Sequence, residues 1–243
     1  MPREFCHRCR RPRDYCLCPS LPPMETRTRI VLLMHPMEWK REKCTTGRIT
    51  CLNLANSEII PGLAFDDHPR VRALIDDPAN LPMLLYPGEG ATDLSEEGFP
   101  AGRLGGRRLV VFLIDSTWAC ARAVAKASPG LLTLPRLKFT PREKSRWVIK
   151  RQPADYCLST LEAVHELLLS LEEAGIEEYE DKSRLLDVFA AMQAAQVEAK
   201  ERAPRPRHFS RRAGRALGAE EEGRVAGGED GGSPAEDGGD RRA

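Results

Sequence analysis

The sequence predicts an α/β fold in which helices flank a mainly parallel sheet. Several short apolar runs are bounded by turn-forming residues, and their continuous apolarity is typical of strands buried on both faces. Segments of helical character follow these runs, and an alternation of strands and helices favours parallel pairing. The runs that we expect to form strands are 30–34, 83–86, 109–114 and 147–149.

Four helices are expected between and after these strands. The third is the best defined, because Ser159 and Glu162 have the spacing of a capping box, in which each side chain bonds the other residue's backbone N–H. Gly175 supplies a C-terminal stop for the same helix. The expected helices span residues 46–55, 118–127, 160–174 and 181–202.

Composition and charge favour a soluble protein with one main core. The 243 residues are 41% hydrophobic and 30% charged, and no apolar run reaches the roughly 18 residues needed to cross a bilayer. The first residues lack the basic stretch, apolar core and cleavage site of a secretory signal, so we expect a cytoplasmic protein. The formal net charge is only +1. Affinity for a polyanion must therefore come from a local basic patch.

The composition changes from residue 203 onward. This tail is rich in Gly, Arg and Glu, shows no apolar periodicity and cannot bury a core, so we expect it to be disordered. Its basic front, residues 205–212, is either a solvated segment or a contact for RNA phosphates. The expected organisation is a cysteine-rich module in 1–23, an α/β domain in 24–202 and a disordered tail in 203–243.

Four of the eight cysteines lie close together near the N-terminus. Cys6, Cys9, Cys16 and Cys18 can surround one tetrahedral ion after a single reversal of the chain. In a reducing compartment this spacing indicates a structural zinc ion, with iron–sulfur ligation and free thiols as alternatives. Because all four coordination positions are filled by protein, a catalytic zinc is not expected. The four later cysteines are interpreted as small apolar residues.

Polar residues follow two of the expected strands directly. The first strand ends in His35-Pro36-Met37-Glu38, and the other ends in Asp115-Ser116-Thr117-Trp118. In parallel sheets, ligands bind beyond the carboxyl ends of the strands, so both segments are candidates for an active site. Each residue alone also has a structural interpretation, as a helix cap, a core indole or a buried histidine.

Several motifs occur in a fixed order along the chain, which resembles the order in the DTW-domain family. They are the cysteine cluster, His-Pro-x-Glu, Thr45-Thr46-Gly47-Arg48, Tyr86-Pro87-Gly88-Glu89, Asp115-x-Thr-Trp, Leu134-Pro135-Arg136 and Leu158-Ser159-Thr160-Leu161-Glu162-Ala163. The resemblance spans roughly residues 6 to 172. The sequence departs from the commonest family wording at Ser116, where Gly is frequent, and at Lys43-Cys44-Thr45.

The resemblance implies a SPOUT-like α/β fold with a C-terminal knot. It also implies a tRNA-uridine aminocarboxypropyltransferase, which moves the 3-amino-3-carboxypropyl group of S-adenosylmethionine to N3 of a uridine. The expected partners are therefore tRNA and S-adenosylmethionine. Three alternatives stay open: an RNA methyltransferase with the same donor, an aminocarboxypropyltransferase acting on rRNA, and a zinc RNA-binding protein without catalysis.

Under this activity, Asp115 is the expected general base. Uridine N3 carries a proton and is a poor nucleophile until a base removes it. Trp118 is expected to stack on the uracil or on the adenine of the donor, and His35 and Glu38 are expected near the reacting centre. N3 lies on the Watson–Crick edge, so the target uridine must be unpaired or extruded.

Strand-end loops are expected to hold the donor. The helix start at Ser159 and Thr160 offers free N–H groups for its carboxylate, although Ser159 is equally explained as a pure cap. The remaining expected donor-binding residues are Leu113, Ser116, Thr117, Pro135 and Arg136.

A basic segment is the expected contact for RNA. Residues 138–151 hold six basic side chains with Trp147 among them, a combination that suits phosphate contact plus stacking. The alternative is a solvated basic edge strand. The expected RNA-binding residues are Arg48, Lys144, Arg146 and Arg151.

Overall fold

Six strands form one sheet in the computed structural model, which describes residues 4–18, 22–41, 45–149, 154 and 156–202. The strand order is β2-β1-β5-β3-β6-β4, and every neighbouring pair is parallel. The described residues up to Glu201 belong to one compact unit. The strands are β1 (Arg29–Met34), β2 (Ser57–Pro61), β3 (Asn80–Leu85), β4 (Thr92–Asp93), β5 (Arg108–Asp115) and β6 (Arg136–Lys138).

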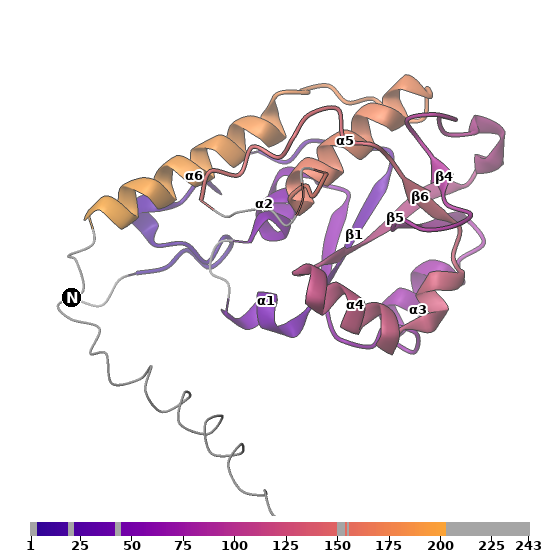
Figure 1. Ribbon diagram of the computed structural model, residues 1–243, viewed down its shortest axis with the longest axis horizontal. Helices are drawn as coiled ribbons and strands as arrows, with labels where there is room; N and C mark the ends of the chain where they lie inside the picture. The colour runs from indigo at the N-terminus through magenta and orange to yellow at the C-terminus, as the bar shows by residue number, and fades with distance from the viewer. Residues whose placement is uncertain (1–3, 19–21, 42–44, 150–153, 155, 203–243) are drawn as a thin grey trace, which may run out of the picture. The chain divides into compact units, whose positions relative to one another are not determined.

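Helices cover both faces of this sheet. Figure 1 shows α2, α5 and α6 on one side, and α3 and α4 on the other. Side chains alternate between the two faces along each strand, so Ile30 and Leu32 join the cluster that contains residues of α2, α5 and α6, while Val31 and Leu33 join the opposite cluster. The helices are α1 (Pro36–Arg41), α2 (Thr46–Asn53), α3 (Pro69–Ile75), α4 (Trp118–Ala127), α5 (Thr160–Glu173) and α6 (Arg184–Arg202), with short 3₁₀ turns at Arg13–Tyr15, Ala101–Leu104 and Pro129–Thr133.

The register of the neighbouring strands β1 and β5 brings the polar strand ends together. Met34 of β1 lies opposite Asp115 of β5. The backbone N–H of His35 donates to the Asp115 carbonyl at 3.2 Å. The two candidate segments, which are far apart in sequence, therefore begin side by side at one edge of the sheet.

The expected mixed α/β architecture is confirmed. Strands occur at three of the expected runs, and helices at all four expected segments, with ends that differ by a few residues. The capping box of Ser159 and Glu162 is present in full, and Gly175 ends α5 in the left-handed region with φ of 70°. The sequence reasoning missed the short strands β2, β4 and β6 and the short helices α1 and α3.

The expected strand at 147–149 is wrong. Trp147 packs edge-to-face on Phe189 of α6, with ring centroids 4.9 Å apart, but Val148 is 74% exposed. The Gln193 amide accepts from the Val148 N–H at 2.7 Å and donates to the Arg146 carbonyl at 2.9 Å. A side chain of α6 thus provides hydrogen bonds to the backbone of this segment, and among the described residues no strand pairs with the segment.

The last helix, α6, is amphipathic and packs on the same face as α5. Leu185, Val188, Phe189 and Met192 are buried in the core. Within the part of the chain that the structure describes, no helix is both long and apolar enough to cross a membrane. The expected tail, 203–243, lies outside the described residues.

Candidate active site

Asp115 is a buried carboxylate at the carboxyl end of β5. Only 6% of the residue is exposed. The Thr160 hydroxyl, at the start of α5, donates to Asp115 Oδ1 at 2.6 Å. A hydrogen bond of this length fixes the orientation of the carboxylate.

The other oxygen of Asp115 lies against the first turn of α2. A Cβ added to Gly47 would lie 1.9 Å from Asp115 Oδ2 and 2.7 Å from its Cγ. Only glycine allows this approach, so Gly47 has a packing role that the Thr-Gly-Arg pattern alone did not reveal. Thr45 caps α2 by accepting from the Arg48 N–H at 3.2 Å. The carboxylate therefore lies beside the first turn of α2.

A largely apolar cavity of about 550 Å³ opens beside this carboxylate. It lies beyond the ends of β3, β5 and β6 and is closed on one side by the start of α5. A volume of this order suits a small-molecule ligand. The lining residues at the ends of β3 and β5 and the start of α5 include Leu85, Leu113, Ile114, Ser116, Thr160 and Ala163.

Three expected donor-binding residues line the cavity, and four do not. Leu113, Ser116 and Thr160 belong to its wall. Ser159 instead forms the capping box with Glu162, as its structural interpretation requires. Thr117 caps α4 by accepting from the Cys120 N–H at 3.4 Å.

Pro135 and Arg136 are likewise absent from the cavity wall. The Arg136 guanidinium donates to the carbonyl of Glu89. It also fills the space beside Gly88, whose φ of 148° is a conformation that favours glycine. Arg136 therefore shapes the loop that carries Tyr86 and Pro87, both of which line the cavity.

The sequence reasoning missed the aromatic side chains around the cavity. Tyr86 and Phe139 line it, as does Tyr156, which is 70% exposed. A tyrosine shortly before the Ser159 cap is a signal that was available, because exposed aromatic rings next to a pocket suit stacking on a flat ligand.

The remaining expected catalytic residues lie at the same edge of the sheet. The half-buried His35 accepts from the Met37 N–H at 3.1 Å through Nδ1, which caps α1. Glu38 is half-buried within α1. Trp118 is the first residue of α4, and its side chain lies outside the described part of the structure.

Arg48 is a buried cation close to Asp115. Only 7% of the residue is exposed, and its guanidinium carbon lies 4.4 Å from the centre of the Trp39 ring. Burial lowers the pKa of Arg48, and the neighbouring Arg10 adds to that effect, whereas Asp115 acts in the opposite direction. Arg48 thus sits in the electrostatic field of the candidate base.

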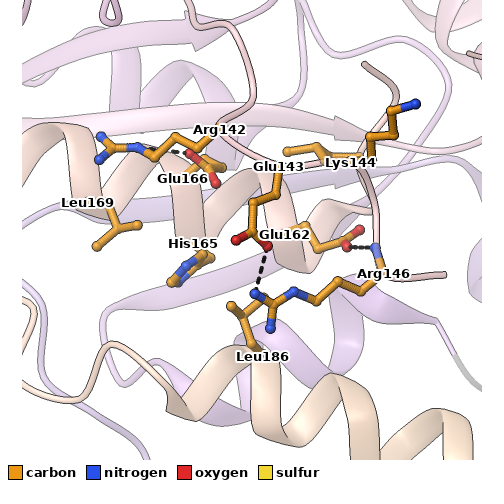
Figure 2. A pocket seen from close by; sticks show the side chains of 10 residues that line it. Arg142, Glu143, Lys144, Arg146, Glu162, His165, Glu166, Leu169 and Leu186 are labelled. Carbon is orange, nitrogen blue, oxygen red and sulfur yellow. Dashed lines mark hydrogen bonds and ion pairs between the residues drawn. The ribbon is translucent and has the colours of Figure 1, made fainter. Parts of the chain in front are cut away.

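The basic segment that begins at Lys138 is extensively ion-paired. Figure 2 shows Arg142 against Glu166 and Arg146 against Glu143, while the Lys144 ammonium points away from the other labelled side chains. Arg142 also binds Glu173 through two hydrogen bonds of 2.6 and 2.7 Å. Much of this positive charge is thus locally neutralised, and the expected RNA contact at Arg151 lies outside the described residues.

The cysteine cluster has the geometry of a metal site. The four sulfur atoms of Cys6, Cys9, Cys16 and Cys18 lie within 4.8 Å of one another, with Cys6–Cys18 at 3.8 Å and Cys9–Cys16 at 3.7 Å. Zinc–sulfur bonds of about 2.3 Å in a tetrahedron place sulfur atoms about 3.8 Å apart. Burial and the neighbouring thiols raise the pKa of Cys18, whereas a backbone hydrogen bond at Cys9 lowers the pKa of Cys6 to about 6. A bound cation would stabilise all four groups as thiolates. The donor set therefore fits zinc.

These features define a parallel α/β domain with a buried carboxylate next to residues that line an apolar cavity, joined to a four-cysteine module. The family model described as the DTW domain matches residues 3–197. The chain belongs to the DTW-domain family.

The relatives include "tRNA-uridine aminocarboxypropyltransferase 2" of Drosophila melanogaster, which is 34% identical over 176 residues covering 70% of this chain and 67% of the relative. The Mus musculus protein of the same name is 31% identical over 180 residues, covering 70% of this chain and 57% of the relative. "tRNA-uridine aminocarboxypropyltransferase A" of Arabidopsis thaliana is 27% identical over 239 residues, covering 86% and 88%. No solved structure matches the chain.

Proposed function

We propose that this chain is a tRNA-uridine aminocarboxypropyltransferase that uses S-adenosylmethionine. The observation that carries the proposal is the Asp115 carboxylate, which is buried, held by Thr160 at 2.6 Å and placed beside an apolar cavity of about 550 Å³. The names of the relatives support the reaction and the tRNA substrate.

The reaction requires a base that removes the N3 proton and a donor carbon that is held within reach of N3. The sulfonium of the donor makes the adjoining carbons electrophilic, and the protein selects among them by position. Asp115 accepts the N3 proton of the uridine. N3 then bonds the terminal carbon of the aminocarboxypropyl group, the carbon–sulfur bond breaks, and 5′-methylthioadenosine leaves with the bonding electrons.

The surrounding residues take roles that follow from their positions. Leu113, Ser116 and Thr160 are assigned to the donor, since they line the cavity. Trp118 keeps its proposed stacking role, and His35 and Glu38 are assigned to the edge where the uridine enters. The four-cysteine site is assigned a structural zinc ion.

We also propose residues that contact RNA, a division of the chain into segments and a cellular location. Arg48, Lys144, Arg146 and Arg151 are the proposed RNA contacts, although Arg146 is also paired with Glu143 at 2.8 Å. The chain is divided into a zinc module (1–23) and a SPOUT-like catalytic domain with a C-terminal knot (24–202), and the tail expected at 203–243 lies outside the described residues. The proposed location is the cytoplasm, where tRNA is abundant.

Mass spectrometry tests the reaction directly. tRNA nucleosides from cells with and without the gene should differ in aminocarboxypropyluridine. With purified protein, transfer should release methylthioadenosine, whereas release of adenosylhomocysteine would indicate the methyltransferase alternative. Persistence of the modified nucleoside in the deletion strain, without a paralogue that supplies it, would overturn the proposal.

Asp115→Asn tests the assigned base. General bases contribute about 10²- to 10⁴-fold to rate, so we expect a loss in that range with donor affinity retained. Asp76→Asn is the matched control, because Asp76 is exposed and bonded to Arg72 at 3.0 Å. Normal transfer by the Asp115→Asn protein would remove Asp115 from the mechanism.

A further inference from the structure

Two guanidinium groups lie against the indole of Trp39, one from the cysteine module and one from α2. The guanidinium carbons of Arg10 and Arg48 lie 4.5 and 4.4 Å from the centre of the Trp39 ring. Arg10 also donates from Nη1 to the Trp39 carbonyl at 3.0 Å. Trp39 thus brings together one cation from the cysteine module and one from α2.

Arg48 is the more unusual of these two cations. Only 7% of the residue is exposed, yet its Nε and Nη2 atoms have no hydrogen-bond partner among the described residues. Burying charged donors without partners is costly, and stacking on an indole does not satisfy them. A bound anion would supply the missing acceptors.

Arg10 is held in place by the fold of the cysteine module. It directly follows Cys9, has φ of 59°, and its N–H donates to the Cys6 carbonyl at 2.8 Å. A left-handed conformation at a residue other than glycine is strained and is retained where the surroundings determine it. The same loop that positions two metal ligands therefore aims Arg10 at Trp39.

The location of this pair favours a nucleic-acid phosphate over the donor's carboxylate. Gly47, next to Arg48, touches Asp115, so the pair lies beside the reacting edge. Neither arginine lines the cavity beside Asp115. Guanidinium groups suit phosphate oxygens because their planar forks donate several hydrogen bonds at once.

We propose that Arg10 and Arg48, placed together by Trp39, form a binding site for a backbone phosphodiester of the tRNA close to the target uridine. The cysteine module then supplies half of a substrate site as well as structure. This inference rests on the proposed function, since it takes tRNA as the substrate.

The test is a salt titration of tRNA affinity with metal-loaded protein. Arg10→Gln should weaken binding about fivefold to tenfold near 0.1 M salt and reduce the slope of log affinity against log salt by about one. Arg13→Gln is the matched control from the same module, since Arg13 is exposed and lies 3.6 Å from Glu4. That control should bind as the wild type does, and metal content should be equal in all three proteins.

Arg48→Lys gives a second measure because it keeps the charge and loses the fork. We expect weaker tRNA binding with S-adenosylmethionine affinity unchanged. Unaltered tRNA affinity and salt slope in Arg10→Gln, or a loss of donor affinity in place of tRNA affinity, would overturn the phosphate site. Binding of tRNA is measured separately from turnover. A failure of the phosphate site would therefore be seen in the tRNA affinity, whereas a failure of the proposed reaction would be seen in the identity of the released by-product.

Discussion

Replacing Gly47 with alanine would place a methyl group on the Asp115 carboxylate. The added Cβ would lie 1.9 Å from Asp115 Oδ2, whereas ordinary contact begins near 3.4 Å, so one group must move by about 1.5 Å. The Cβ would also lie 3.1 Å from Leu32 Cδ1, which limits the movement of α2. The carboxylate should therefore be the group that gives way.

A displacement of about 1 Å at a reacting group can cost about 100-fold in rate. We expect Gly47→Ala to lower the single-turnover rate of methylthioadenosine release by about that factor. Its melting temperature should change little, because alanine gains up to about 1 kcal/mol of helix propensity over glycine, which offsets strain from the moved carboxylate.

Gly102→Ala is the matched control, since a Cβ there meets nothing within 4 Å. Both variants should bind S-adenosylmethionine, which equilibrium titration measures. A folded Gly47→Ala protein that retained more than about a tenth of the wild-type rate would refute the argument that contact with Gly47 positions the base.

Three further predictions follow from the same structure. Thr160→Val removes the 2.6 Å bond to Asp115, and since bonds to charged groups are worth about 1.5–3 kcal/mol, kcat should fall by at least about tenfold; an unchanged kcat would contradict this. A strong chelator should release about one equivalent of zinc and lower the melting temperature by several degrees; less than about half an equivalent of zinc in the purified protein, with no iron, would count against the metal site. Burial lowers the pKa of His165, so the unfolded chain takes up a proton first as the pH falls through about 6.5. The stability that the neutral, buried His165 contributes is complete above that pH and is lost as the pH falls toward its pKa in the folded protein. The His165→Gln protein lacks this titration, so its melting temperature should fall less steeply between about pH 7.5 and 5.5 than that of the wild type.

Local chemistry made parts of this site predictable from sequence. The four cysteines lie within a short segment, so their spacing alone predicted that their sulfur atoms would cluster. Asp115 ends a continuous apolar run, and the parallel strands place it at the edge where the strands end. The capping box at Ser159 likewise depends on neighbours along one helix.

Contacts between segments that are far apart in the chain could not be predicted from the sequence. The approach of Gly47 to Asp115 and the pairing of Arg10 with Trp39 depend on how separate elements pack. β6 is three residues long, too short for periodicity to reveal. At Trp147 the apolar pattern was misleading, because one ring is packed against α6 while the next side chain is exposed.

The hydroxyl of Thr160 belongs to two sites at once. It bonds Asp115 at 2.6 Å and forms part of the cavity wall. A ligand in the cavity that changes the orientation of this hydroxyl also changes the proton affinity of Asp115. By thermodynamic linkage, protonation of Asp115 must then change the affinity for that ligand by the same factor. Through Thr160, donor binding would set how readily the base takes a proton before the uridine arrives.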